Sequence, residues 1–238
     1  MAETIYTIPI NEAFDEAAES EKCTCPFCKL ESDLEHNEID IILGASMMEP
    51  DIRIKTNEKG FCPTHFSKLM THGKRLPMAL MLESHLNEIY DDITKKDETK
   101  NADKVLKRLN TLNCSCYICD RVSSNYKKIL SNAVYMWSSD EEFRKKLSSQ
   151  KCFCVKHFCD LTAVASNQLG KKPFAEFYDS ASSVFASYFK DLKGDISWFC
   201  KKFDYRYQEE PWYNAKDSVE RAVAFLACDI SPEKFTTK

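Results

Sequence analysis

One pattern of metal-ligand residues occurs twice in this chain, and it constrains the fold more than any other feature. In each copy a C-x-x-C pair precedes a C-x-x-H pair, and the second copy follows the first by 91 or 92 residues. The residues concerned are Cys25, Cys28, Cys62 and His65, and then Cys116, Cys119, Cys154 and His157. Three thiols and one imidazole form a tetrahedral Cys3His set, and each short pair lets one turn present two ligands. The duplication argues against cysteines that are merely small buried hydrophobes.

The spacing leaves open which pairs share an ion. Short intervening segments favour local closure, in which each copy forms its own site. The first site would then consist of Cys25, Cys28, Cys62 and His65, and the second of Cys116, Cys119, Cys154 and His157. In the alternative the copies exchange pairs, and Cys25 and Cys28 meet Cys154 and His157. In either arrangement the sequence predicts two structural zinc ions.

Two other chemistries compete with zinc. A [4Fe–4S] cluster also takes four ligands, mostly cysteines, although the histidine in each set favours zinc. A thiol-based redox or metal-trafficking role, which would use the cysteines outside the two sets, is the second alternative. Cys25-Pro26-Phe27-Cys28 also looks like the C-P-x-C motif of a thioredoxin-type active site. That motif requires a preceding hydrophobic strand, and Glu21 to Thr24 do not resemble one.

Several cysteines lie outside the two sets. Cys23 and Cys114 occupy matching positions in the two copies, and each is predicted to be a spare ligand or a neighbour of the ligands. For the others we expect a core or incidental role; they are Cys152, Cys159, Cys200 and Cys228.

Apolar residues recur at helical spacing almost throughout, and no alternating strand pattern is evident, so the fold class is predicted to be all-α. Pro26 and Pro63 are suited to the first turn of a helix. Ser139 with Glu142 fits a capping box. His85 lies on an apolar helical stripe and is expected to be a core histidine.

The charged stretch from Lys95 to Asp103 marks the boundary between two repeats, which we place at 1–96 and 97–193.

Residues 194–238 are predicted to form an aromatic-rich helical segment that packs on the repeats. Seven aromatic residues lie between Trp198 and Tyr213, interleaved with charged side chains. The same segment is a candidate surface for a protein partner, because exposed aromatic and charged groups dominate binding surfaces.

Composition and charge argue against several classes of function and location. Net charge is −4 and no basic stripe is present, which argues against nucleic-acid binding. The first twenty residues do not resemble a signal peptide and no stretch is apolar enough to span a membrane, so a cytoplasmic location is expected. In that compartment the 12 cysteines should be reduced or bind metal. No signature of a nucleophilic or phosphate-binding enzyme occurs, and we expect a non-catalytic scaffold or partner-binding protein.

Several segments resemble an uncharacterised bacterial family of unknown function. They are Ile8 to Phe14, the C-P-x-C pair, Met48 to Arg53, Gly60 to Phe66, and Lys202 to Arg206 followed by Pro211-Trp212. The resemblance runs along nearly the whole chain. It implies that both kinds of ligand pair, the Phe-Asp-Tyr-Arg element and the Pro-Trp element belong to the family pattern. It implies no activity, and the chain departs from the pattern at Cys23, Cys152 and Cys159.

Overall fold

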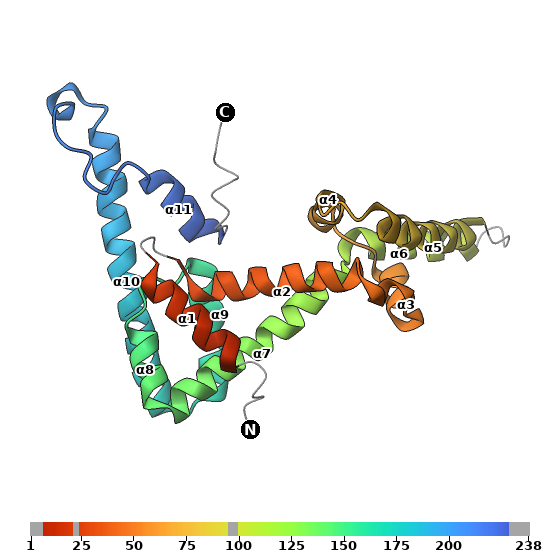
Figure 1. Ribbon diagram of the computed structural model, residues 1–238, viewed down its shortest axis with the longest axis horizontal. Helices are drawn as coiled ribbons and strands as arrows, with labels where there is room; N and C mark the ends of the chain where they lie inside the picture. Colours follow the sequence, from red (N-terminus) through yellow and green to blue (C-terminus); the bar gives the residue numbers. More distant parts are fainter. Residues whose placement is uncertain (1–6, 21–23, 95–99, 229–238) are drawn as a thin grey trace. The chain divides into compact units, whose positions relative to one another are not determined.

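The computed structural model describes residues 7–20, 24–94 and 100–228 (Figure 1). These residues form helices and connecting turns without a strand, which confirms the all-α prediction. The α-helices are α1 (Thr7–Glu19), α2 (Pro26–Ile42), α3 (Pro50–Lys59), α4 (Pro63–Thr71), α5 (Arg75–Thr94), α6 (Lys100–Cys114), α7 (Tyr117–Ser139), α8 (Glu141–Ser148), α9 (Val155–Gln168), α10 (Lys171–Lys201) and α11 (Ser218–Ala227).

Helix boundaries follow local chemistry. Helices α2 and α4 begin at Pro26 and Pro63, where the missing N–H costs no helical hydrogen bond. The predicted cap at Ser139 is wrong, because α7 continues through that residue. Asp140 caps α8 instead, and its side chain accepts a hydrogen bond of 2.9 Å from the Glu142 amide.

The chain divides into two compact units. Unit 1 comprises residues 1–31 and 127–238, and unit 2 comprises residues 32–126. The chain passes from one unit to the other within α2 and returns within α7. Each unit therefore draws residues from both copies of the sequence repeat.

In unit 1, helices α8, α9 and α11 pack against the long helix α10, and α1 packs against α8 (Figure 1). Aromatic rings form much of its core. The Phe14 ring lies 5.4 Å from that of Phe27 and 5.1 Å from that of Phe143. The Phe27 ring also lies 6.0 Å from Phe153, the residue before Cys154. The start of α2 is thereby packed next to the start of α9.

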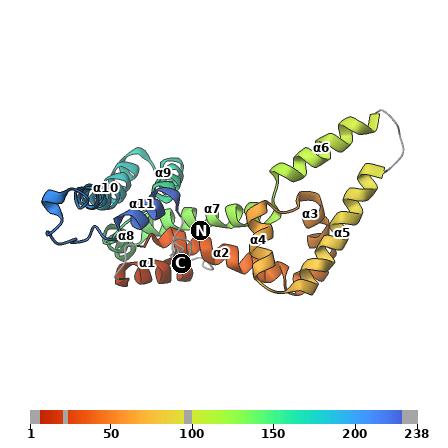
Figure 2. The same ribbon diagram turned by 90° about the horizontal axis from the view of Figure 1, so that it is seen from above.

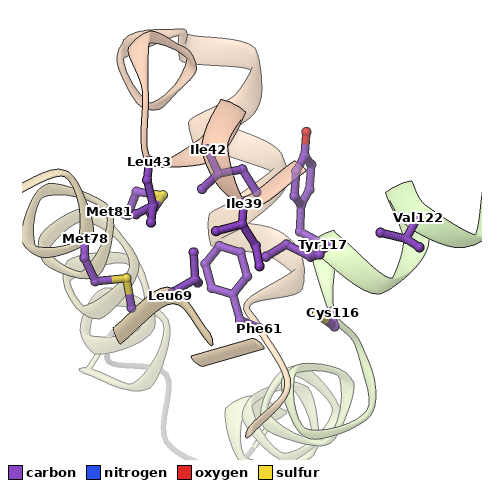
Figure 3. Packing of buried hydrophobic residues seen from close by; sticks show 11 residues of the cluster. Ile39, Ile42, Leu43, Phe61, Leu69, Met78, Met81, Cys116, Tyr117 and Val122 are labelled. Carbon is purple, nitrogen blue, oxygen red and sulfur yellow. The ribbon is translucent and has the colours of Figure 1, made fainter. Parts of the chain in front are cut away.

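In unit 2, α3 contacts α5, α6 and the short 3-10 helix η2 (Ala45–Met48), and α4 contacts α5 (Figure 2). Its core joins the end of α2 to the start of α7 (Figure 3). The buried members of this core are Ile39, Ile42, Leu43, Phe61, Leu69, Met78, Met81, Cys116, Tyr117, Ile118 and Val122. A predicted metal ligand, Cys116, is therefore part of the hydrophobic cluster.

The aromatic segment after α10 turns back onto the end of that helix. The ammonium group of Lys202 is buried and donates hydrogen bonds to the carbonyls of Tyr207, Gln208 and Glu210. Trp198 Nε1 donates to the Pro211 carbonyl at 3.0 Å. These bonds fasten the segment to the helix.

Within the described residues, no helix combines the length and the apolar character needed to cross a membrane.

Candidate metal centres

All eight predicted ligands lie in two clusters. Cluster 1, in unit 1, contains Cys25, Cys28, Cys154 and His157, and cluster 2, in unit 2, contains Cys62, His65, Cys116 and Cys119. Within each cluster the four ligand atoms lie within 4.8 Å of one another. Each cluster takes its C-x-x-C pair from one copy of the repeat and its C-x-x-H pair from the other.

This arrangement corrects the prediction of local closure. Cys25 and Cys28 do not meet Cys62 and His65; they meet the second pair of the other copy. The reason is the path of the helices. Helix α2 starts in unit 1 and ends in unit 2, so the two pairs that flank it belong to different units. The exchanged arrangement is the one that the fold adopts.

Every ligand pair is placed at a helix N-terminus in the same way. The first ligand immediately precedes the helix, and the second is its third residue, as at Cys62 and His65 of α4. Cys62 and Cys154 have nearly the same backbone conformation, with φ −72° at both and ψ 163° and 164°. Free N–H groups and the helix dipole favour negative charge at this position, which suits thiolates. The Cys119 amide, for example, donates to Cys116 Sγ at 3.5 Å.

In cluster 1 the His157 Nδ1 atom faces the three sulfurs. It lies 3.1 Å from Cys154 Sγ, 3.2 Å from Cys28 Sγ and 3.6 Å from Cys25 Sγ. Cys28 Sγ and Cys154 Sγ are 3.6 Å apart. All four side chains are buried.

Cluster 2 has the same geometry. His65 Nδ1 lies 3.2 Å from both Cys62 Sγ and Cys116 Sγ, and 3.3 Å from Cys119 Sγ. Cys62 Sγ and Cys119 Sγ are 3.9 Å apart. Unlike its counterparts in cluster 1, Cys119 is exposed and Cys62 is half-buried.

These spacings fit a single tetrahedral ion. With zinc–sulfur and zinc–nitrogen bonds of about 2.3 Å and about 2.0 Å, a tetrahedron separates two sulfurs by roughly 3.8 Å and a sulfur from a nitrogen by roughly 3.5 Å. The distances from 3.1 to 3.9 Å in the two clusters are close to those values. A cubane cluster places several iron atoms between its ligands and would hold the sulfurs farther apart.

The other ring nitrogen of each histidine is hydrogen-bonded to its own glutamate on α2. When Nδ1 binds a metal among the sulfurs, Nε2 carries the ring proton and donates a hydrogen bond to the carboxylate. His157 Nε2 bonds Glu31 Oε2 at 3.0 Å, and His65 Nε2 bonds Glu35 Oε1 at 2.9 Å. A carboxylate in this position fixes the tautomer and the ring orientation of a metal-binding histidine. Both glutamates were missed in the sequence, because they are not matched between the copies.

The electrostatics of cluster 2 favour a cation at its centre. The hydrogen bond with His65, aided by Lys68, holds the pKa of Glu35 at about 2. Burial lowers the pKa of His65, but contacts with Cys116 and Glu35 outweigh it and raise that pKa to about 10. Burial raises the pKa of Cys116, but the hydrogen bond with His65 lowers it to about 6. Without a metal the cluster thus binds a proton tightly.

Cluster 1 behaves similarly. Contacts with the Cys154 and Cys25 sulfurs, together with burial, raise the pKa of the Cys28 thiol. Three buried sulfurs so close together repel one another as thiolates unless a cation lies between them. A divalent ion between the sulfurs offsets this repulsion, so that no thiolate has to be protonated.

Gly60 helps to assemble cluster 2. It ends α3 with φ at 61°, a conformation that glycine adopts without strain. Its carbonyl accepts a 3.0 Å hydrogen bond from the amide of Tyr117, the first residue of α7. The loop that carries Cys62 is thereby joined to the helix that carries Cys119.

The remaining cysteines differ in their surroundings. Cys114, Cys159 and Cys200 are exposed and lie outside the clusters, and Cys152 is buried. Cys23 lies outside the described residues. Cys228, expected to be incidental, is in contact with a ligand: its sulfur lies 3.3 Å from Cys154 Sγ.

The fold and the two clusters define an all-α protein with paired Cys3His centres, each made from two helix N-termini. The chain belongs to the DUF6062 family, a family of unknown function whose model matches residues 1–233. The predicted resemblance to an uncharacterised family is thus confirmed. No match was found among curated proteins or among solved structures.

Proposed function

We propose that the protein binds two zinc ions, one in each Cys3His cluster, and that these ions are structural. The observation that supports this most directly is the convergence of three sulfurs and one Nδ1 within 4.8 Å in each cluster. Zinc takes cysteine and histidine ligands tetrahedrally, and a fourth protein ligand leaves no open position for a substrate.

The single-ion spacing favours zinc over the iron–sulfur alternative. In cluster 1 the His157 Nδ1 lies 3.2 Å from Cys28 Sγ, which leaves no room for several metal atoms between these ligands. The Glu31 and Glu35 contacts add support, because a carboxylate behind the histidine is common in zinc proteins.

A structural role follows from the segments that the ions would join. Cys28 and Cys154 are 126 residues apart in sequence. A bond through zinc would close this long loop, and binding energy would become folding energy. A chain with this many thiols is typical of a reducing compartment, so the proposal includes a cytoplasmic location.

The same proposal gives the protein a non-catalytic scaffold role, with the aromatic segment as the surface for a protein partner. Phe203 and Tyr205 are 72% and 82% exposed, although they are large and partly apolar. We expect Phe203→Ser with Tyr205→Ser to leave the zinc content unchanged and to remove proteins that co-purify with the wild type. If the same proteins co-purify with the variant, the aromatic segment is excluded as the partner-binding surface.

The proposal is tested by purifying the protein without oxygen, recording its visible spectrum and measuring metals by mass spectrometry. A colourless protein with about two zinc per chain is expected. Replacement by Co²⁺ should give the intense visible bands of tetrahedral thiolate coordination. Iron with acid-labile sulfide, or a chain without metal, would contradict the proposal.

A further inference from the structure

A fifth thiol lies against cluster 1. Cys228 Sγ is 3.3 Å from Cys154 Sγ, closer than any of the sulfur–sulfur distances given above for the two clusters. Cys228 is not one of the four converging donors, so it contacts one ligand without completing the set. It is half-buried, whereas Cys154 is buried.

The fold holds this thiol in place. Cys228 follows α11, and its amide bonds the Ala224 carbonyl at 3.0 Å. Helix α11 contacts both α9 and α10. The buried ring of Phe225 lies 5.3 Å from the ring of Phe185 on α10. Cys154 directly precedes α9, so packed helices fix both sulfurs.

The backbone at Cys228 is left-handed, with φ at 59° and ψ at 25°. Glycine or asparagine is the usual residue at such a helix end, and other side chains adopt this conformation at a cost. This position can therefore be changed to glycine without strain, which provides a variant that lacks the thiol and keeps the fold.

We propose that Cys154 and Cys228 form a thiol-oxidation site, at which a disulfide bond replaces the Cys154–metal bond. A disulfide has an S–S distance of about 2.05 Å, so the sulfurs need to approach by only about 1.2 Å. Loss of Cys154 as a ligand leaves cluster 1 with two sulfurs and one nitrogen, and its ion is released. The release of zinc depends on the proposed function; formation of the disulfide does not.

The oxidant is a peroxide. One of its oxygens first transfers to the more accessible sulfur, in the thiolate form that attacks peroxides: Cys228–S⁻ and H₂O₂ give Cys228–SOH and hydroxide, which takes up the proton that the thiol released. The Cys154 thiolate then attacks the Cys228 sulfur, the S–S bond forms and hydroxide leaves. The two sulfurs lose two electrons in total, and the peroxide gains two. A thiol reductant reverses the change and regenerates the ligand.

Cluster 2 provides an internal comparison. Cys114 lies two residues before Cys116, but it is exposed and does not belong to the converging group. Mild oxidation is therefore expected to act on cluster 1 although its ligands are the more deeply buried. Simple exposure would predict the opposite order.

The test treats zinc-loaded protein with hydrogen peroxide and maps disulfides by peptide mass spectrometry. A weak chromogenic zinc indicator measures the zinc that peroxide releases, relative to a sample of the same protein without peroxide. The wild type should lose half of its zinc and yield a Cys154–Cys228 peptide, and dithiothreitol with added zinc should restore both. Cys228→Ser and Cys228→Gly should retain their zinc at the same dose. Cys200→Ser, which removes an exposed thiol outside the clusters, should behave as the wild type.

Equal zinc loss in the Cys228 variants, or a disulfide that joins Cys154 to Cys25 or Cys28, would overturn the inference. Should the purified chain contain no metal, the proposed function fails. The Cys154–Cys228 disulfide is still scored in that case by peptide mapping, and its absence after peroxide treatment would overturn the inference separately.

Discussion

The sulfur atoms of Cys28 and Cys154 lie 3.6 Å apart although 126 residues separate them in the chain. His65 and Cys116 in the other cluster show the reciprocal relationship, with 3.2 Å between Nδ1 and Sγ across 51 residues. Each copy of the repeat thus supplies half of each cluster. Neither copy contains a complete site by itself, so the duplication produces two centres that each need both copies.

The carboxylate behind the histidine is expected to tune metal affinity. In Glu35→Gln the neutral amide accepts more weakly from His65 Nε2, and zinc affinity should fall by roughly 10- to 100-fold. Competition with a chelator of known affinity measures this change. Glu83→Gln, an exposed change on α5, is the matched control and should leave affinity unaltered. An affinity equal to that of the wild type in Glu35→Gln would show that this hydrogen bond is irrelevant to the ion.

The two centres should release metal in a fixed order. Cys119 is exposed and Cys62 half-buried in cluster 2, whereas all four ligands of cluster 1 are buried. A chelator therefore reaches cluster 2 first, and release should occur in two phases. Cys116→Ser, which disables cluster 2, should abolish the fast phase. Loss of the slow phase in that variant would contradict the order.

The buried ammonium of Lys202 should hold the aromatic segment on α10. Lys202→Met keeps much of the side-chain volume but removes the ammonium group that donates to three carbonyl groups. We expect a local destabilisation of about 1–3 kcal/mol, seen as faster hydrogen exchange in residues 203–213. Lys201→Met, on the exposed side, should leave exchange unchanged. Unchanged exchange in both variants would refute this role.

His85 should make unit 2 less stable in acid. Its Nδ1 atom is buried without a hydrogen-bond partner among the described residues. Burial, reinforced by Arg108 and opposed by the Asn57 backbone and Glu88, lowers its pKa below 6.5. The folded state therefore favours the neutral ring, and this contribution is present above pH 6.5 and lost as the pH falls from there through the lowered pKa.

The comparison with His85→Leu isolates this effect, since acid displaces metal from both proteins. Urea midpoints measured at about pH 7.5 and about pH 5.5 should fall further in the wild type than in the variant. Equal losses in the two proteins would mean that His85 does not titrate between these values.

Local features of the sites could be predicted from the sequence. The ligand pairs, and the helices that begin at Pro26 and Pro63, follow from residues within one turn of each other. Pairing could not be predicted, because it depends on the course of α2 and α7 between the two units. Loop-closure free energy changes slowly with loop length, so a short segment between pairs is a weak guide to which pairs meet.

Other parts of the sites depend on tertiary contacts. Glu31 and Glu35 resemble ordinary surface glutamates on α2 until the fold brings a histidine to each. The contact of Cys228 with a ligand could not be predicted either, since its neighbour Cys154 is 74 residues away in the sequence. The error at Ser139 was of another kind: Asp140 offers an equally good cap one residue later, and the apolar face of α7 continues far enough to use it.

The exchanged pairing is the central claim, and metal counting in two double variants tests it most directly. Each double variant removes two ligands. Cys25→Ser with Cys154→Ser disables one cluster and should leave about one zinc per chain, whereas Cys25→Ser with Cys62→Ser disables both and should leave about none. Mass spectrometry of the native proteins gives the counts. The reverse result, with one ion retained in the Cys25–Cys62 variant and none in the Cys25–Cys154 variant, would restore local closure and contradict the account.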